Sequence, residues 1–358
     1  MIASWLPPRA ALADDCVPRV LLAVAFRDEA ASLPDLLDAI DDLDYPPDRL
    51  RIALIDDASA DASDSLARVW AAWNPNATLL TIRANVGKAE ALNRALQSAD
   101  GYEIFAVFDA DVRPRRDCLR KLAAAFADPR VAAVGGYTKP VVAPRNIVSA
   151  YAALEAWTHQ LVNLAAKDRL DLNPPVGGGN CAYRRDALVR AGGFPRGTFS
   201  EDTAVSLAMA NNGGTLRFVR DAICEHRTTD SLRFFWNQRQ RWSSGMASVV
   251  GQASGLESVL VGLGYADRFV MLVVAALALA GSIGPVWLAV IAAPAAAAIG
   301  SALAKGRPRA AELRTLAIGF PFMAAIDVGV SVFASVTHMI GNRPVWASRH
   351  KEVAGQNE

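Results

Sequence analysis

The chain has 358 residues, of which 52% are hydrophobic, and its 37 lysines and arginines nearly balance 36 aspartates and glutamates. This length favours one large domain with additional segments, and the apolar content excludes a disordered or collagen-like chain. A net charge of +1 provides no field that would hold a polyanion, so nucleic acid is not expected as a partner.

The N-terminal segment and the cysteines further limit the class of protein and its compartment. The first twenty residues contain Arg9, Asp14 and Asp15 and no long apolar run, so we expect neither a signal peptide nor an N-terminal anchor. The cysteines stand far apart, without CxxC or Cys/His spacing, which argues against a zinc site or a disulfide framework and fits a reducing compartment. The four cysteines are Cys16, Cys118, Cys181 and Cys224, and most of them are expected to be small core residues.

Residues 18–230 are typical of alternating strands and helices. The sequence predicts strands at 20–26, 51–55, 78–82 and 104–108, with helices at 32–43, from about 61, and at 87–97. This spacing predicts an α/β fold with a mostly parallel sheet flanked by helices. In such sheets ligands gather at the carboxyl ends of the strands.

Acidic residues follow two of these strands. One strand ends in Asp56-Asp57 and another in Asp109-Ala110-Asp111. There is no GxGxxG after the first strand and no complete phosphate loop around Lys88, which disfavours a dinucleotide site. A phosphorylated ligand would then need a divalent cation and basic side chains, and hard carboxylates suit Mg²⁺ or Mn²⁺. Alone, two acids in a turn are more often solvated or capping, and Lys88 is equally a solvated surface lysine.

Two later segments add to this pattern. Ser200-Glu201-Asp202-Thr203 opens a helical stretch, where one acid could serve simply as an N-cap. The segment Gln238-Arg239-Gln240-Arg241-Trp242 follows other arginines and aromatic residues. It also predicts an amphipathic helix at a membrane interface, and the two interpretations of this segment are compatible.

The apolar excess lies in the C-terminal third. Residues 269–304 contain no charge, and as one helix they would extend about 54 Å, well beyond a hydrocarbon core of about 30 Å. Glycines and a proline in the middle favour a hairpin of two short membrane helices, 269–283 and 286–304, over one tilted or kinked helix. A basic patch and a second apolar run follow, predicting a third helix at 315–340. Asp327 in that run is expected to face other helices or water rather than lipid.

Taken together, the motifs resemble those of the membrane-associated family 2 glycosyltransferases, which include cellulose, chitin and hyaluronan synthases and related glycolipid-forming enzymes. The resemblance runs from about residue 19 to residue 244. Its motifs occur in the family's order: Asp56-Asp57-Ala58-Ser59, Asp109-Ala110-Asp111, Ser200-Glu201-Asp202 and Gln238-Arg239-Gln240-Arg241-Trp242. Each is weak singly, but together and in this order they are specific. The segment from Gly177-Gly178-Gly179-Asn180 to Gly192-Gly193-Phe194 is also similar.

The resemblance implies a GT-A fold and inverting transfer of a sugar from a nucleotide diphosphate, usually UDP. It assigns Asp202 as the general base and Asp111 as the ligand of Mg²⁺ or Mn²⁺. It places Trp242 against the acceptor sugar. It also implies a set of donor-binding side chains: Asp56, Asp57, Lys88, Asp109, Gln238 and Arg241.

These expectations divide the chain into an N-terminal extension (1–17), a GT-A catalytic domain (18–230), an interfacial amphipathic region (231–264), a transmembrane region (265–341) and a C-terminal tail (342–358). We expect an integral membrane protein of a bacterial-type plasma membrane, with the catalytic domain cytoplasmic because the basic patch fits the positive-inside rule. The expected partners are a UDP-sugar, the membrane, and a lipid or glycan acceptor. A partner subunit or a second copy would be needed if a polymer were secreted. The alternative is a non-catalytic nucleotide-sugar-binding scaffold subunit of an envelope glycan complex.

Overall fold

The structure is a computed structural model that describes residues 1–6, 17–196, 200–250, 277, 280–282 and 285–339. The seven elements expected before residue 109 are all present. The strands are β1 (Val20–Phe26), β2 (Leu50–Asp57), β3 (Ala77–Ile82) and β4 (Ile104–Phe108), and the helices are α1 (Leu33–Asp41), α2 (Ser63–Trp73) and α3 (Lys88–Gln97). Short 3₁₀ turns lie at Ile2–Trp5 (η1), Pro47–Arg49 (η2) and Ala125–Ala127 (η3).

The remaining elements extend this unit. Four strands follow: β5 (Val112–Pro114), β6 (Val131–Val141), β7 (Asn180–Arg184) and β8 (Thr215–Arg227). The helices between and after them are α4 (Cys118–Ala124), α5 (Ile147–Trp157), the π-helical turn η4 (Thr158–Leu164), α6 (Ala165–Arg169), α7 (Arg185–Arg190), α8 (Glu201–Asn211), α9 (Leu232–Val250), α11 (Pro285–Gly306) and α12 (Ala310–Met339).

The eight strands form one mixed sheet in the order β3-β2-β1-β4-β7-β6-β8-β5. The first four run parallel, as the strand–helix pattern predicts, and their carboxyl ends share one edge. Beyond β4 the sheet becomes mixed: β7 is antiparallel to both β4 and β6, while β6 and β8 are parallel to each other. The central β4 therefore delivers Asp109 to the middle of the sheet edge.

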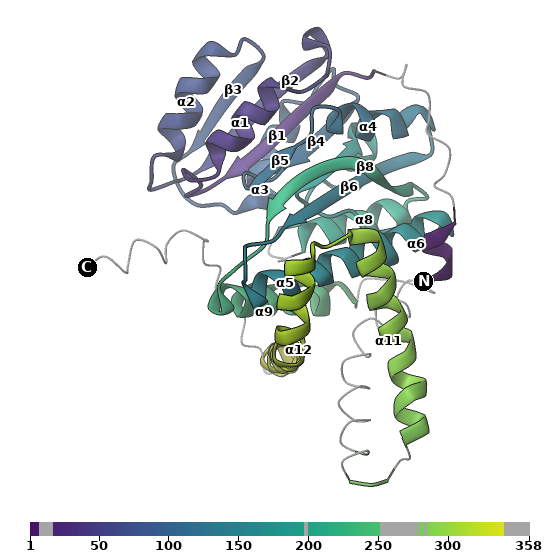
Figure 1. The fold of residues 1–358 in the computed structure, drawn as a ribbon. Coiled ribbons are helices and arrows are strands. Elements are labelled where there is room, and N and C mark those ends of the chain that lie inside the picture. Colours follow the sequence, from purple (N-terminus) through teal and green to yellow (C-terminus); the bar gives the residue numbers. More distant parts are fainter. Residues whose placement is uncertain (7–16, 197–199, 251–276, 278–279, 283–284, 340–358) are drawn as a thin grey trace, which may run out of the picture.

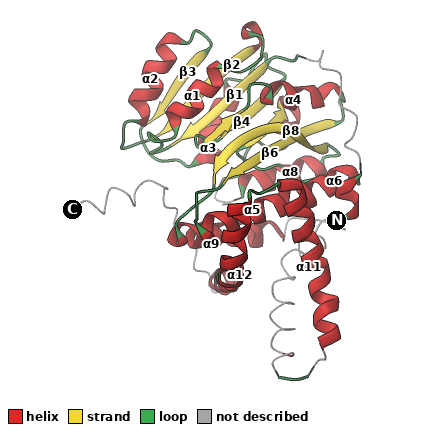
Figure 2. Ribbon diagram, viewed as in Figure 1, coloured by secondary structure: helices red, strands yellow, loops and turns green. Residues whose placement is uncertain are grey.

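Helices cover both faces of the sheet (Figures 1 and 2). Alternate side chains of β1 point to opposite faces, so Leu22 packs with helices α1, α2 and α4 whereas Leu21 packs with α3, α7 and α8. The apolar spacing of α1, with Leu33, Leu36 and Ile40 buried, is that of one helical face. Two apolar layers thus hold the sheet rigid beneath the loops at its edge.

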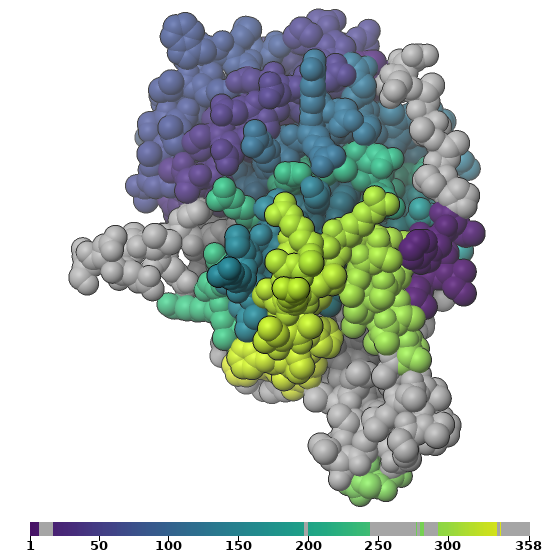
Figure 3. All heavy atoms as spheres, viewed as in Figure 1, coloured from purple at the N-terminus to yellow at the C-terminus, as the bar shows by residue number. Residues whose placement is uncertain are grey.

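The C-terminal helices pack below the sheet domain, where α12 lies against α5 and α9 and α11 lies against α5 and η4 (Figures 1 and 3). Glycine permits the close approach, since a Cβ on Gly306 would come within 2.5 Å of Trp157 and one on Gly319 within 2.6 Å of Ile147. At the N-terminus, Trp5 Nε1 donates to Ser301 Oγ of α11 at 2.9 Å.

The predicted membrane segments are represented only in part. Within the described residues one helix is long and apolar enough to cross a membrane, over Ala310–Ala334 of α12. Residues 286–304 fall inside α11, whereas the predicted segment 269–283 lies almost wholly outside the described residues. Asp327 is 4% exposed and contacts side chains of α5 and α9, which confirms that it faces other helices.

Candidate active site

The carboxylates of Asp56 and Asp57 shape the loops that border the sheet edge. Asp57 accepts hydrogen bonds from the backbone amides of Val86 and Gly87, each at 2.8 Å. Asp56 accepts one from the amide of Ser59 at 3.1 Å, and its burial raises the pKa of its carboxyl. Both are at most 5% exposed. Asp57 therefore holds the turn before α3 in place, and Asp56 holds the loop that follows β2.

Lys88 and Asp109 lie at the centre of the edge formed by the carboxyl ends of the parallel strands. Lys88 begins α3 directly after Gly87, whose φ of 85° suits glycine. Its ammonium donates to Asp109 Oδ1 at 2.6 Å and to the carbonyl of Gly178 at 3.1 Å. Burial opposes the charge on Lys88, but the carboxylates of Asp109 and Glu201 raise the pKa of its ammonium above its ordinary value. Lys88 is thus a fixed cation at the end of β4.

Asp202 approaches the same point from the other side. It lies in the first turn of α8, where the helix dipole favours a carboxylate. Its Oδ2 accepts from the amide of Gly178 at 2.7 Å and its Oδ1 from the amide of Thr203 at 2.7 Å. The neighbouring Glu201 lies 3.8 Å from Lys88, and burial raises the pKa of its carboxyl.

Gly178 and Gly179 allow these groups to meet. A Cβ on Gly178 would lie 3.1 Å from Lys88 Nζ and 3.2 Å from Asp202 Oδ2, and one on Gly179 would lie 2.6 Å from Asp109 Oδ2. We call Gly178 and Gly179 the glycine spacer, because the absence of side chains at these two residues leaves room for the cation and the two acids.

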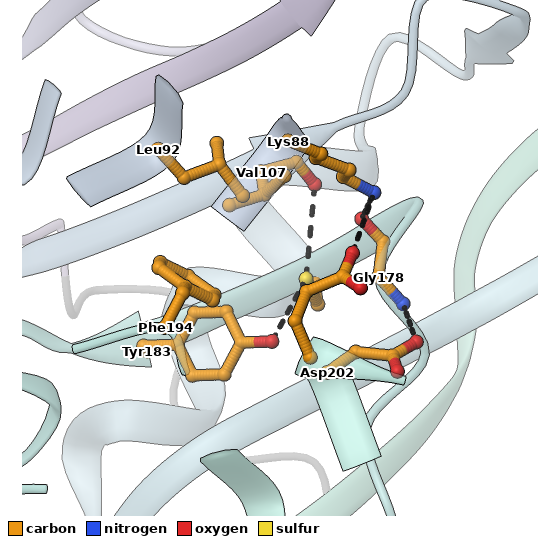
Figure 4. Close-up of a pocket in the computed structure, with 9 residues that line it drawn as sticks. Lys88, Leu92, Val107, Gly178, Tyr183, Phe194 and Asp202 are labelled. Atoms are coloured by element: carbon orange, nitrogen blue, oxygen red, sulfur yellow. Dashed lines mark hydrogen bonds and ion pairs between the residues drawn. The ribbon is translucent and has the colours of Figure 1, made fainter. Parts of the chain in front are cut away.

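Figure 4 shows this spacer in a pocket, with Lys88 and Asp202 on either side of Gly178 and the ring of Tyr183 beside them. Burial raises the pKa of the Cys181 thiol at the pocket wall to about 12, so a thiolate nucleophile is not available there. The pocket is lined by Lys88, Leu92, Val107, Gly178, Cys181, Tyr183, Phe194, Glu201 and Asp202.

A second pair of side chains could hold a cation. Asp111 Oδ2 lies 3.1 Å from His226 Nε2, since β5 and β8 pair with Val112 opposite His226. Within the described residues no group of three or more His, Cys, Asp or Glu side chains is placed to hold a metal. A carboxylate oxygen suits Mg²⁺ or Mn²⁺, whereas an imidazole nitrogen favours transition metals, so this pair would fit Mn²⁺ better than Mg²⁺.

The helix α9 brings the last motif toward this region. Burial lowers the pKa of Arg241, and the Glu201 carboxylate opposes that shift, which places Arg241 within electrostatic reach of the α8 acids. Gln238 is half-buried, and Trp242 is 48% exposed. Arg241 of the motif thus interacts electrostatically with Glu201, whereas Trp242 is about half exposed.

The structure therefore brings Lys88, Asp109 and Asp202 together, with Arg241 nearby. Sequence reasoning did not find Glu201 or His226 as members of the site. Glu201 could have been predicted, because it adjoins Asp202 in the same sequence motif. His226 had none, because its place beside Asp111 depends on strand pairing across 115 residues.

A mixed sheet of this order, with a charged site at the ends of its parallel strands, has the architecture of the GT-A fold that the motifs led us to expect. The model of "Glycosyl transferase family group 2" matches residues 104–303, and the chain belongs to that family. A second model, described as the N-terminal domain of glycosyltransferase family 25, matches residues 17–78.

Curated relatives are similar over the same region. The chain is 25% identical over 238 residues to the probable glycosyltransferase YdaM of Bacillus subtilis (strain 168), covering 65% of this chain and 56% of that protein. It is 26% identical to the beta-monoglucosyldiacylglycerol synthase of Synechocystis sp. (strain ATCC 27184 / PCC 6803 / Kazusa) over 238 residues, 64% of this chain and 48% of the synthase. The match thus spans about half the length of these relatives.

A solved structure is similar over nearly the whole chain. The mannosyltransferase PcManGT from Pyrobaculum calidifontis, in complex with GDP-Man and Mn²⁺, superposes with a TM-score of 0.66 at 25% identity. The match covers 94% of this chain and 92% of the mannosyltransferase, so the C-terminal helices belong to the similarity as well as the sheet.

Proposed function

We propose that this protein transfers a hexose or N-acetylhexosamine from a nucleotide-diphosphate sugar to a membrane-held acceptor, with inversion at the anomeric carbon. The observation that carries the proposal is the convergence at Gly178 and Gly179, where Lys88 and Asp202 bond to Gly178 and Asp109 bonds to Lys88 beside Gly179. A fixed cation for a diphosphate and a carboxylate for a hydroxyl proton then lie on opposite sides of one spacer.

The donor would lie along the sheet edge. In this proposal the loops shaped by Asp56 and Asp57 receive the nucleoside, and Lys88 with Asp109 meets the ribose and diphosphate. Gln238 and Arg241 approach the diphosphate from α9. The expected nucleotide is UDP, and the GDP-Man in PcManGT makes guanosine diphosphate sugars the comparison to include.

Asp111 and His226 would hold the cation, Mg²⁺ or Mn²⁺. When bound, it would neutralise charge on the departing diphosphate. The Mn²⁺ in PcManGT supports this proposal, as does the carboxylate of Asp111, because carboxylate oxygens suit Mg²⁺ and Mn²⁺.

The chemical step needs one carboxylate. Asp202 takes the proton of the acceptor hydroxyl as the acceptor oxygen forms a bond to the anomeric carbon. The bond from that carbon to the diphosphate oxygen breaks, and its electron pair leaves with the nucleoside diphosphate. Lys88 and Arg241 stabilise the charge that develops on this leaving group. Attack opposite the leaving group inverts the configuration.

The acceptor would be a growing β-linked polysaccharide or a glycolipid, with Trp242 stacking on its sugar. The similarity to a beta-monoglucosyldiacylglycerol synthase supports a lipid, and a 26% identity over 227 residues to cellulose synthase 2 of Novacetimonas hansenii supports a polymer. The latter match covers 62% of this chain and 14% of the synthase. The apolar helix α12 and the exposed Trp242 support action at a membrane.

We also propose the expected organisation for the whole chain: catalytic residues 18–230 on the cytoplasmic side of a plasma membrane, an interfacial region at 231–264 and a membrane region at 265–341. The flanking segments are 1–17 and 342–358.

Nucleotide release tests the function. Protein in lipid nanodiscs is given UDP- and GDP-sugars with Mg²⁺ or Mn²⁺, in the presence of diacylglycerol or membrane lipid extract, and the product is sized and its anomeric configuration read by NMR. Release with one donor and a product of inverted configuration is expected. Nucleotide binding without release under every condition would favour the scaffold alternative.

A further inference from the structure

Three charged side chains meet in a buried cluster where α5, α9 and α12 pack together. Arg239 of α9 pairs with Glu155 of α5, and its Nε lies 3.6 Å from Asp327 Oδ1 of α12. Arg239 is 8% exposed and Asp327 4%. The hydroxyl of Tyr151 donates to Asp327 Oδ2 at 3.5 Å. An aspartate from an apolar helix is therefore bonded to the catalytic unit.

The same arginine also contacts two aromatic rings. Its guanidinium carbon lies 4.6 Å from the ring centroid of Phe235 and 4.6 Å from that of Trp242. A guanidinium is a planar cation that stacks on aromatic faces, so it restricts the orientation of a ring that it contacts. Phe235 is fully buried, whereas Trp242 has 48% of its surface exposed. Arg239 thus connects a rigid core to a ring at the surface.

Apolar residues surround this contact. Phe235 packs with Val148 and Tyr151 of α5 and with Met323 of α12. In such surroundings a charge without its partner is costly, so removing one member strongly affects the position of the others. The orientation of Arg239 is consequently set from α5 and α12 together.

We infer that Asp327 is a positioning residue for acceptor binding, acting through Arg239 on the ring of Trp242. This makes α12 a part of the acceptor site as well as an apolar anchor. The inference rests on the proposed function in one respect, since the acceptor role of Trp242 is itself proposed. The mechanical link from Asp327 to Trp242 does not depend on that role.

The first experiment measures the link directly, without activity. Acrylamide quenching of Trp242 is obtained as the difference between the protein and its Trp242→Phe variant, in nanodiscs. Asp327→Asn should increase the quenching constant of Trp242 by about 2-fold, because the ring loses the fixed cation that restricts its orientation. Asp327→Glu should restore it in part.

The matched control is Asp168→Asn. Asp168 is also buried and pairs with an arginine, since Arg217 Nε lies 2.7 Å from its Oδ1, and this oxygen bonds to Arg217 and the Phe218 amide of β8 rather than to α9. Asp168→Asn should leave the quenching of Trp242 unchanged. If Asp327→Asn does not fold, Arg239→Lys decides, because it keeps the charge and loses the planar stack. Unchanged quenching in the folded variant, or an equal change in Asp168→Asn, would overturn the inference.

The second experiment measures the consequence for transfer. With the acceptor lipid extract, the ratio of transfer to donor hydrolysis should fall about 2- to 30-fold in Asp327→Asn, while donor affinity stays the same. In a Trp242→Ala background the same substitution should have no further effect on that ratio. A fall of equal size in that background would contradict action through Trp242. Absence of transfer in the unmodified protein would instead refute the proposed function and leave the quenching result to decide the link.

Discussion

Gly179→Ala tests the geometry of the site without removing a charged group. A Cβ at this position would lie 2.6 Å from Asp109 Oδ2, where ordinary contact begins at 3.4 Å, so the carboxylate must move by about 0.8 Å. That movement disturbs the 2.6 Å hydrogen bond between Asp109 and Lys88. A Lys88 ammonium moved out of place would lose its proposed hydrogen bond to the donor diphosphate, which is worth about 1.5–3 kcal/mol, so we expect donor affinity to fall by about 10- to 150-fold.

The matched control is two residues away. A Cβ on Gly177 would have no heavy atom within 4 Å, and Gly177→Ala should therefore leave donor affinity unchanged. Isothermal titration of the nucleotide sugar into each variant, with thermal unfolding measured alongside, provides the comparison. Equal donor affinities for Gly179→Ala and Gly177→Ala would refute the spacer role assigned to this segment.

Two other predictions concern the metal and the pH. Asp111→Ala and His226→Ala should each reduce the Mn²⁺-dependent part of nucleotide binding by about 10-fold or more, and titration with and without a chelator checks this; equal binding in His226→Ala would remove His226 from the metal site. The Asp128 carboxylate accepts hydrogen bonds from the guanidinium and the backbone amide of Arg130, and these bonds lower the pKa of its carboxyl to about 2. The ionised carboxylate therefore stabilises the fold above its ordinary pKa of 3.8, and this contribution is lost as the pH falls from there through 2. Thermal unfolding of Asp128→Asn should consequently differ from that of the unmodified protein at pH 6 and approach it only as the pH falls through about 2. A difference of unchanged size well below that pH would contradict the assignment.

The sequence predicted the parallel half of the sheet because its strands are short apolar runs, each followed by a polar turn and a helix. β1 and β4 begin and end at the residues expected for them. The mixed half was less predictable, because the partners of β6, β7 and β8 lie far away in the chain. Apolar character alone specifies a strand but not its neighbour.

The candidate site was likewise predictable from the sequence only in part. Lys88, Asp109 and Asp202 were expected from the family resemblance, and the structure brings Lys88 and Asp202 to Gly178 and Asp109 to Gly179. The pairing of Asp111 with His226 could not be predicted, since it arises from the register of β5 on β8. Asp327 was expected to face other helices, but the identity of its partner in α9 required the packing of α12.

The central claim is tested most directly by Asp202→Asn. The asparagine oxygen can still accept the hydrogen bond from the Gly178 amide, whereas the side-chain NH₂ group loses the bond from Thr203 and cannot take a proton. Nucleotide release and donor affinity would be measured on the same nanodisc preparations of the protein and the variant. We predict that transfer falls by about 100-fold or more while donor affinity is unchanged. Full transfer activity in Asp202→Asn would contradict the assignment of the base and with it the proposed mechanism.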